Sequence, residues 1–169
     1  MAPLLQIREC NPQCSDALSL LAEAAVEASL LYPEFQDPSA PSPTNQPNLP
    51  RGVYLVAYLG EEPVGMAAHR PIDDRTTEVR RMYVKKAARR NGVARALLDR
   101  VEEHAKSVGF TKLLLETGNR QVPAIELYRQ SGFTHIDPFG QYQDDPTSVC
   151  FQKAIHAHTP SAASEETQR

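Results

Sequence analysis

Strands are predicted where β-branched and aromatic residues gather between turn residues. Residues 53–59 and 64–70 are of this kind, and Gly60-Glu-Glu-Pro63 between them has the composition of a hairpin turn. The same composition predicts further strands over residues 4–9, 77–84, 112–117, 133–136 and 148–153.

Helices are predicted where apolar residues recur every three or four positions. Ser15 is the predicted N-cap of a first helix, whose apolar positions run from Leu18 to Leu30. Residues 93–108 carry the apolar stripe of a second helix, closed by Gly109. A short third helix over residues 123–130 has proline in its first turn and Gly132 after its end.

This order of elements predicts an α/β (α+β) fold with a sheet of six or seven strands and helices on its faces. A single domain is expected over residues 1–155. Residues 33–50 hold six of the 14 prolines, so they form a loop, and a loop of that length is usually functional or disordered. The polar tail over residues 156–169 is expected to be flexible.

Composition predicts a soluble globular protein. Of the 169 residues, 41% are apolar and 23% are charged, close to average usage. No apolar run approaches the about 20 residues of a membrane helix, and the first residues lack the apolar block of a signal peptide. The lack of both features predicts no membrane association. The three cysteines match neither a redox motif nor zinc-ligand spacing, so we expect reduced thiols, no metal and a cytoplasmic location.

Charge is unevenly distributed along the chain. The formal net charge is −3, but residues 75–120 hold twelve Lys and Arg against five Asp and Glu, and the rest holds six against sixteen. A basic centre within an acidic chain argues against nucleic-acid binding, which needs a broad positive face. It favours a local anion site, and the densest basic run is Lys85, Lys86, Arg89, Arg90 and Arg95.

That basic run lies in the turn between the predicted strand 77–84 and the helix from Val93. A helix start directs free main-chain N–H groups at the preceding turn, and the helix dipole adds positive character, so phosphate groups bind there. Gly92 permits close backbone approach, and Ala94 keeps the entrance small. The turn is a candidate diphosphate site; the alternative is a solvated basic face beside an ordinary helix start.

Two motifs in this order resemble the GNAT acetyltransferase superfamily. Arg89-Arg90-Asn91-Gly92-Val93-Ala94 matches its acetyl-CoA signature, R/Q-x-x-G-x-G/A. Residues 115–133 resemble a later element, A-x-x-L-Y-x-x-x-G-F, at Ala124, Leu127, Tyr128, Gly132 and Phe133. The resemblance implies a mixed, mostly antiparallel sheet with helices on both faces, splayed at an acetyl-CoA cleft.

The resemblance also implies how acetyl-CoA would be held. The strand before the signature would pair its backbone with the pantetheine arm through Met82, Tyr83 and Val84. The pyrophosphate would lie on the N–H groups of residues 90–95. The full expected binding set adds the signature turn and a later position where many members have Asn: Arg89, Arg90, Asn91, Gly92, Val93, Ala94, Arg95 and Gln121.

Acetyl transfer to an amine needs a base for the ammonium, a donor to the thioester oxygen and an acid for the leaving thiolate. Glu78 is the candidate base, because members with a glutamate base on this strand carry it four residues before the position of Met82. Period-2 geometry predicts that Glu78, Arg80 and Met82 share one face. The alternatives are a surface glutamate paired with an arginine, and a chain of waters in place of a carboxylate base.

An N–H near Val84 is the expected donor, and Tyr128 is the candidate acid, against the alternative of a core tyrosine with a satisfied hydroxyl. Glu116 is expected to be structural. Four further aromatic residues either line an acceptor pocket or fill the core, the core being favoured for the first two: Tyr54, Tyr58, Phe139 and Tyr142.

Together these features predict an acetyl-CoA-dependent N-acetyltransferase that works by direct attack of an amine in a ternary complex. The alternative is a non-catalytic acyl-CoA sensor or interaction module. The acceptor, a small molecule or a protein, is not identified, although the acidic remainder of the chain suits a cationic amine. The loop over residues 33–50 is expected to border the acceptor side, and a homodimer stays open.

Overall fold

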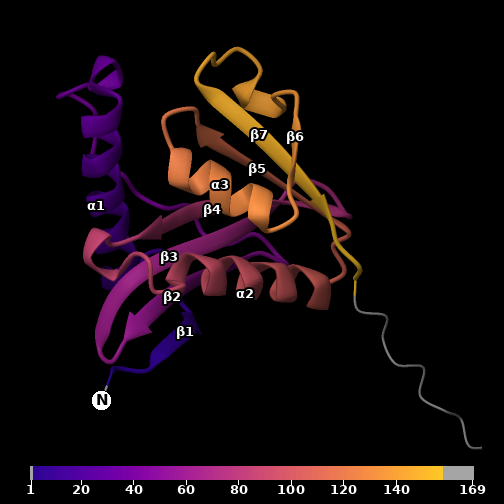
Figure 1. The fold of residues 1–169 in the computed structure, drawn as a ribbon, viewed down its shortest axis with the longest axis horizontal. Helices are drawn as coiled ribbons and strands as arrows, with labels where there is room; N and C mark the ends of the chain where they lie inside the picture. Colours follow the sequence, from indigo (N-terminus) through magenta and orange to yellow (C-terminus); the bar gives the residue numbers. More distant parts are fainter. Residues whose placement is uncertain (1, 158–169) are drawn as a thin grey trace, which may run out of the picture.

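The computed structural model describes residues 2–157, which form a seven-stranded sheet with helices on both faces (Figure 1). The strand order is β1-β2-β3-β4-β5-β7-β6. The strands are β1 (Leu5–Glu9), β2 (Val53–Leu59), β3 (Glu62–Pro71), β4 (Thr76–Val84), β5 (Lys112–Gly118), β6 (Thr134–Ile136) and β7 (Ser148–Ala154). The helices are α1 (Ser15–Leu31), α2 (Val93–Ser107) and α3 (Val122–Gln130). The predicted fold class is confirmed.

The start of α1 differs from the prediction. The N-cap of α1 is Cys14 and not Ser15, because Cys14 keeps an extended backbone and its thiol accepts a hydrogen bond from the N–H of Ala17 at 3.4 Å. Most of the predicted flexible tail lies outside the described residues, which end at residue 157. Among those described residues, no helix is both long enough and apolar enough to cross a lipid bilayer.

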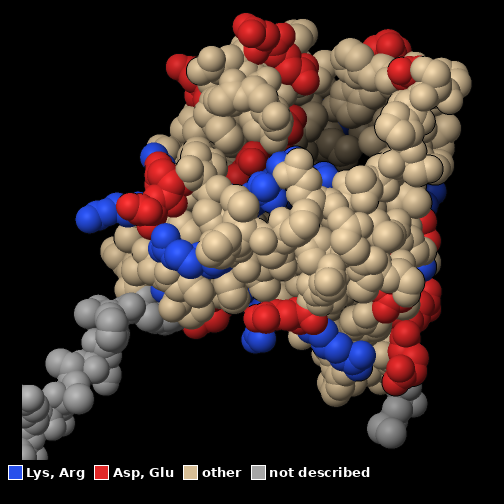
Figure 2. Space-filling model, turned by 180° about the vertical axis from the view of Figure 1, so that it is seen from behind, with Lys and Arg blue, Asp and Glu red and all other residues tan. Residues whose placement is uncertain are grey.

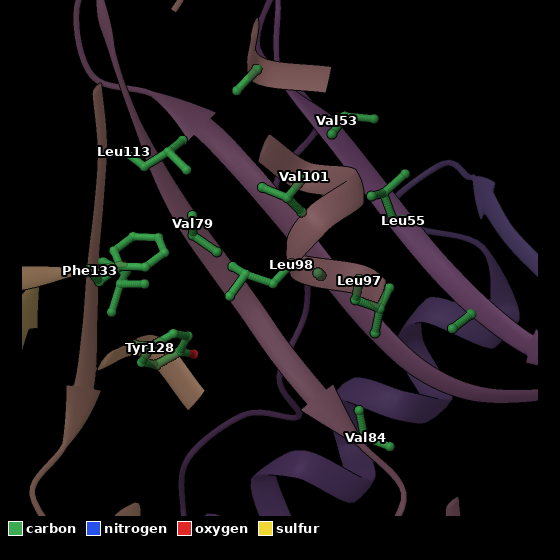
Figure 3. Packing of buried hydrophobic residues seen from close by; sticks show 14 of the residues in the cluster. Val53, Leu55, Val79, Val84, Leu97, Leu98, Val101, Leu113, Tyr128 and Phe133 are labelled. Carbon is green, nitrogen blue, oxygen red and sulfur yellow. The ribbon is translucent and has the colours of Figure 1, made fainter. Parts of the chain in front are cut away.

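The sheet separates two apolar cores. On one face, called here the α2 side, α2 and α3 pack through side chains such as Leu97 and Tyr128 against Leu55 and Val79 (Figure 3). On the opposite face, called here the α1 side, Leu20 and Leu21 of α1 pack against neighbouring strands. Successive residues of β2 alternate between the two cores, as expected for a strand that is covered on both faces.

The sheet opens between β4 and β5. Every other neighbouring pair is antiparallel, whereas β4 and β5 run parallel and pair only over residues 76–79 of β4. On its other edge β4 stays paired with β3 as far as Val84. The two strands therefore separate beyond Val79, and Figure 3 shows them diverging. The predicted splay is confirmed.

A β-bulge in β4 overturns one predicted facing. Arg80 lies opposite Ala68 but Tyr83 lies opposite Met66, so β4 holds one extra residue, and Arg81 has a left-handed φ of 61°. Beyond the bulge the alternation is reversed: Met82 packs against the core on the α2 side. The prediction that Met82 shares a face with Glu78 and Arg80 is wrong, because period 2 holds only for a regular strand.

Candidate active site

The turn between β4 and α2 presents a run of free main-chain donors. Within residues 2–157, no N–H from Arg90 to Arg95 donates to a protein acceptor, and the first N–H bonded in α2 is that of Ala96, to the carbonyl of Gly92 at 3.0 Å. Arg90 and Gly92 have left-handed φ values of 66° and 76°. Successive N–H groups in such a conformation form a concave anion site at a helix start. A phosphate group fits this turn.

Gly92 is required in this turn for its conformation. A Cβ added there would meet no atom within 4 Å, so space does not demand glycine. The positive φ demands glycine, because residues with a side chain rarely adopt this backbone angle. The open space above Gly92 also leaves the free N–H groups accessible from outside the turn.

The basic side chains around the turn differ in what they contact. Arg89 is committed to the fold: its guanidinium donates to both carboxylate oxygens of Glu27 at 2.6 and 2.7 Å and to the carbonyl of Val84 at 2.9 Å. These contacts tie α1 to the end of β4. Of the dense basic run, Lys86 and Arg90 form no ion pair within the described part of the chain. Their charges are available to an anion in the turn.

The end of β4 offers a free strand edge to the opening. The N–H of Lys85 donates to the carbonyl of Val64 on β3 at 2.8 Å. Because N–H groups point alternately to the two edges of a strand, the N–H of Val84 turns away from β3 and into the opening. An extended ligand with amide groups can pair with such an edge as an added strand.

Tyr128 lies in the opening, between the diverging ends of β4 and β5 (Figure 3). Its ring is 4% exposed and packs edge-on against Phe133, with centroids 5.9 Å apart. Its hydroxyl has no hydrogen-bond partner within residues 2–157. Burial first, and then the charge of Glu116, raise the pKa of Tyr128, so the hydroxyl keeps its proton at neutral pH. The ring is core, but the hydroxyl is not satisfied as a core hydroxyl would be.

Glu78 lies on the α1 side of the same region. Its side chain is buried, and its Oε2 accepts a hydrogen bond from the hydroxyl of Tyr142 at 2.8 Å. Glu78 is therefore not a solvent-facing partner of an arginine, and it forms no ion pair within the described residues. Burial, with the nearby charge of Glu78, raises the pKa of Tyr142 to about 12, so this phenol stays a donor.

A second carboxylate, Glu116, lies close to Glu78. It is half-buried on β5 and accepts from the hydroxyl of Ser148 at 3.1 Å. Burial, and then the charges of Asp145 and Glu78, raise the pKa of Glu116. Cys150 lies opposite Glu116 in the sheet, and burial together with the two carboxylates raises the pKa of its thiol. A protonated thiol is a poor nucleophile, which argues against an acyl-cysteine route.

A cavity of about 160 Å³ opens on the α1 side. Glu78 does not line it, but Arg70, which lies opposite Glu78 in the sheet, does. Its wall from the proline-rich loop comprises Thr44, Asn45, Gln46, Asn48 and Leu49, and its wall from the sheet comprises Tyr54, Ala68, His69, Arg70, Arg80 and Arg81. Figure 2 shows the molecule from behind, where the surface is hollowed and basic side chains border the hollow. Tyr58 is buried core as favoured, whereas Tyr54 is both buried and part of this cavity.

The sequence analysis missed two features of this region. It did not predict Tyr142 as the partner of Glu78, because the two residues are 64 positions apart in the chain. It did not predict that Arg80 and Arg81 both line the cavity, because that depends on the bulge. The only local signal was a pair of adjacent arginines in a strand that was otherwise expected to be buried.

Comparison with known sequences points to one family. The model of the acetyltransferase (GNAT) family matches residues 21–133. An IAA acetyltransferase of Azospirillum brasilense is 45% identical over 78 residues, which cover 46% of this chain and 51% of that protein. The uncharacterized N-acetyltransferase YsnE of Bacillus subtilis (strain 168) is 34% identical over 108 residues, which cover 63% of this chain and 72% of that protein. The chain thus spans about half the length of the first relative.

Comparison with solved structures gives the same fold. A protein from Klebsiella pneumoniae, described as an acyl-CoA N-acyltransferase, is 28% identical with a TM-score of 0.72, covering 89% of this chain and 97% of that one. The PaiA N-acetyltransferase of Thermoplasma acidophilum, solved with coenzyme A, is 15% identical with a TM-score of 0.68, covering 90% of this chain and 99% of that one. At 15% identity, the similarity to the Thermoplasma acidophilum protein shows the fold alone.

Proposed function

The chain belongs to the acetyltransferase (GNAT) family, and on that premise we propose that it is an acetyl-CoA-dependent N-acetyltransferase acting on an amine. One observation carries the proposal: the free N–H groups of residues 90–95 lie at the end of β4, where the sheet opens beside Tyr128. An anion site and an unpaired strand edge adjoin in this way where a diphosphate is joined to an extended amide chain, as in coenzyme A.

The residues of the chain fit coenzyme A. Its pyrophosphate would lie on the N–H groups of residues 90–95, and its pantetheine amides would pair with the free edge over residues 82–84. Gln121 is the N-cap of α3, and its side chain makes no hydrogen bond within residues 2–157, so it is free to contact the pantetheine arm. When bound, acetyl-CoA supplies the acetyl group as a thioester.

Glu78 would take the proton of the attacking ammonium, directly or through water. An ammonium has a pKa of about 10 and cannot attack until that proton is lost. Tyr142 holds Oε2 of Glu78, and no residue in the described part of the chain holds Oε1. The carboxylate is thereby oriented with one oxygen left for the acceptor.

Two groups at the opening would act on the thioester of acetyl-CoA. The N–H of Val84 would donate to the oxygen of the acyl group as negative charge develops there. Tyr128 would donate its proton to the departing sulfur, because its raised pKa keeps that proton in place at neutral pH. Glu78 lies on the α1 side and Tyr128 on the α2 side, so the base and the acid approach the opening from opposite faces.

The alternative, a non-catalytic CoA-binding module, would require both side chains to be buried away from any cleft. Both are buried, but Tyr128 lies in the opening with a free hydroxyl, and Glu78 lies opposite Arg70, which lines the cavity. These placements favour an enzyme. Release of free CoA thiol from acetyl-CoA, measured across a panel of amines, tests the choice. Acetyl-CoA that raises the melting temperature without thiol release on any amine would instead establish the binding module.

Glu78→Gln tests the role of the carboxylate. If Glu78 is the base, turnover should fall most near neutral pH, and the defect should shrink as the pH approaches the pKa of the acceptor amine. If Glu78 only attracts a cation, KM should rise with turnover unchanged, and added salt should have the same effect. Glu61→Gln, in the exposed β2–β3 turn, is the matched control and should alter neither constant. Unchanged constants in Glu78→Gln would contradict both roles.

A further inference from the structure

Three arginines line the cavity on the α1 side, and one of them, Arg70, lies opposite Glu78 in the sheet. Arg70 comes from β3, and Arg80 and Arg81 come from β4. None of them forms an ion pair within the described residues. Arg80 feels the charge of Glu116, but the two side chains are not in contact at ion-pair distance. A small cavity lined by three guanidinium groups that form no ion pair within the described residues favours an anionic ligand, and arginine forks suit a carboxylate.

The bulge in β4 is what brings two of these arginines to the same face. In a regular strand Arg81 would point to the α2 side, next to Val79. The bulge turns it back, so that Arg80 and Arg81 both line the cavity. Its cost is a left-handed φ of 61° at a residue other than glycine, a conformation that persists where the surrounding structure holds it.

Asn45 of the proline-rich loop holds the guanidinium of Arg81 in place. Asn45 is 5% exposed, and its Oδ1 accepts a hydrogen bond from the Nε of Arg81 at 2.9 Å. Its Nδ2 donates to the carbonyl of Pro12 at 2.9 Å and to the hydroxyl of Tyr54 at 3.2 Å. The cavity is thus a built site, in which a buried amide fixes one arginine and leaves its remaining donors free.

Glu78 and Arg70 lie directly opposite each other on neighbouring strands. Side chains in that relation have Cβ atoms about 4.5–5.5 Å apart. The two side chains are neighbours on one face of the sheet but form no ion pair within the described residues, so a carboxylate and a guanidinium are both present for a ligand that carries an amine and a carboxylate. The cavity of about 160 Å³ is close to the about 150 Å³ that a benzene-sized molecule fills, so a small ligand is indicated.

We propose that the acceptor is an amine that also carries a carboxylate, of the α-amino acid type, with its amine at Glu78 and its carboxylate at Arg70, Arg80 and Arg81. The inference rests on the proposed function and names the acceptor class of that same site. It departs from the cationic acceptor that the acidic remainder of the chain suggested, because the local charge of the cavity is positive although the net charge of the chain is −3.

The test compares acceptors that share an amine and differ only in the carboxylate. Free amino acids and their amides, with polyamines as a third group, are presented with acetyl-CoA, and kcat/KM is measured by release of CoA thiol. We expect amino acids to be preferred over the corresponding amides by at least about 10-fold, the lower range for a charge-assisted contact. Amides or polyamines accepted as well as amino acids would overturn the inference and leave the acetyltransferase intact.

Arg80→Gln assigns the preference to the cavity. It should lower kcat/KM for amino acids by about 10- to 100-fold and leave kcat/KM for amides nearly unchanged. Arg70→Gln should act in the same direction, and Arg100→Gln, on the exposed face of α2, should change neither. Equal losses for acids and amides in the two cavity variants would overturn the assignment. No thiol release with any amine, from folded wild-type protein, would overturn the proposed function itself, an outcome distinct from the others.

Discussion

Tyr128→Phe removes a single oxygen from the opening between β4 and β5. The ring would keep its edge-on contact with Phe133 and its contact with Phe151, whose centroids lie 5.9 and 6.1 Å away. A hydroxyl that is hydrogen-bonded in a core contributes about 1 kcal/mol or more, but this one has no partner within residues 2–157. We therefore expect the free energy of unfolding to change by less than about 0.5 kcal/mol, a shift in melting temperature of about 2 °C at most.

Activity should change much more than stability. A positioned general acid contributes about 10²–10⁴-fold, so the turnover number should fall by at least about 10²-fold, equivalent to about 2.7 kcal/mol of barrier. Because burial and the charge of Glu116 raise the pKa of Tyr128, the wild-type hydroxyl stays protonated from acid to mildly alkaline pH. The defect should therefore be constant over that range, with acetyl-CoA affinity little changed.

Tyr58→Phe is the matched control, with the opposite expectation. Its hydroxyl donates to Asp16 at 2.5 Å and lies in the core on the α1 side, so its removal should cost about 1–2 kcal/mol of stability and leave turnover intact. The assays are steady-state release of CoA thiol, calorimetric binding of acetyl-CoA and chemical unfolding. Turnover of a folded Tyr128→Phe within threefold of wild type would refute the general-acid role.

Two further predictions concern the turn and a buried histidine. Gly92→Ala should abolish the rise in melting temperature that acetyl-CoA produces, because φ at this position is 76°. Gly60→Ala, at φ 59° in a remote hairpin turn, is the control and should lose stability but keep the rise. Equal behaviour of the two variants would place the cofactor elsewhere. Burial, then the charges of His104 and Arg51, lowers the pKa of His69 to about 3, so the unfolded chain binds a proton below pH about 6.5 that the folded chain does not. Stability should thus fall with decreasing pH between these values, by about 2 kcal/mol from pH 7 to pH 5, and chemical unfolding of His69→Gln should show a flatter dependence that His156→Gln does not share.

Much of this protein is determined by local sequence. Apolar spacing, turn residues and helix-end glycines locate the strands and helices, because each of these signals acts between residues a few positions apart. The signature turn is local as well, since Gly92 and the start of α2 are neighbours in the chain, and their backbone conformations place the free N–H groups. The family could therefore be recognised from two short motifs.

The tertiary structure alone decided which side chains meet. Arg89 stays a predicted cofactor contact, and the sequence did not indicate that its guanidinium binds Glu27, 62 positions away. For Glu78, the alternative to a catalytic base was a surface glutamate paired with an arginine, but its hydrogen-bond partner is Tyr142, 64 positions away. Such contacts depend on how elements pack, and no local pattern encodes them. The facing of Arg81 and Met82 is likewise set by pairing with β3, because one extra residue reverses every later position, and the positive charge of the cavity follows from that pairing.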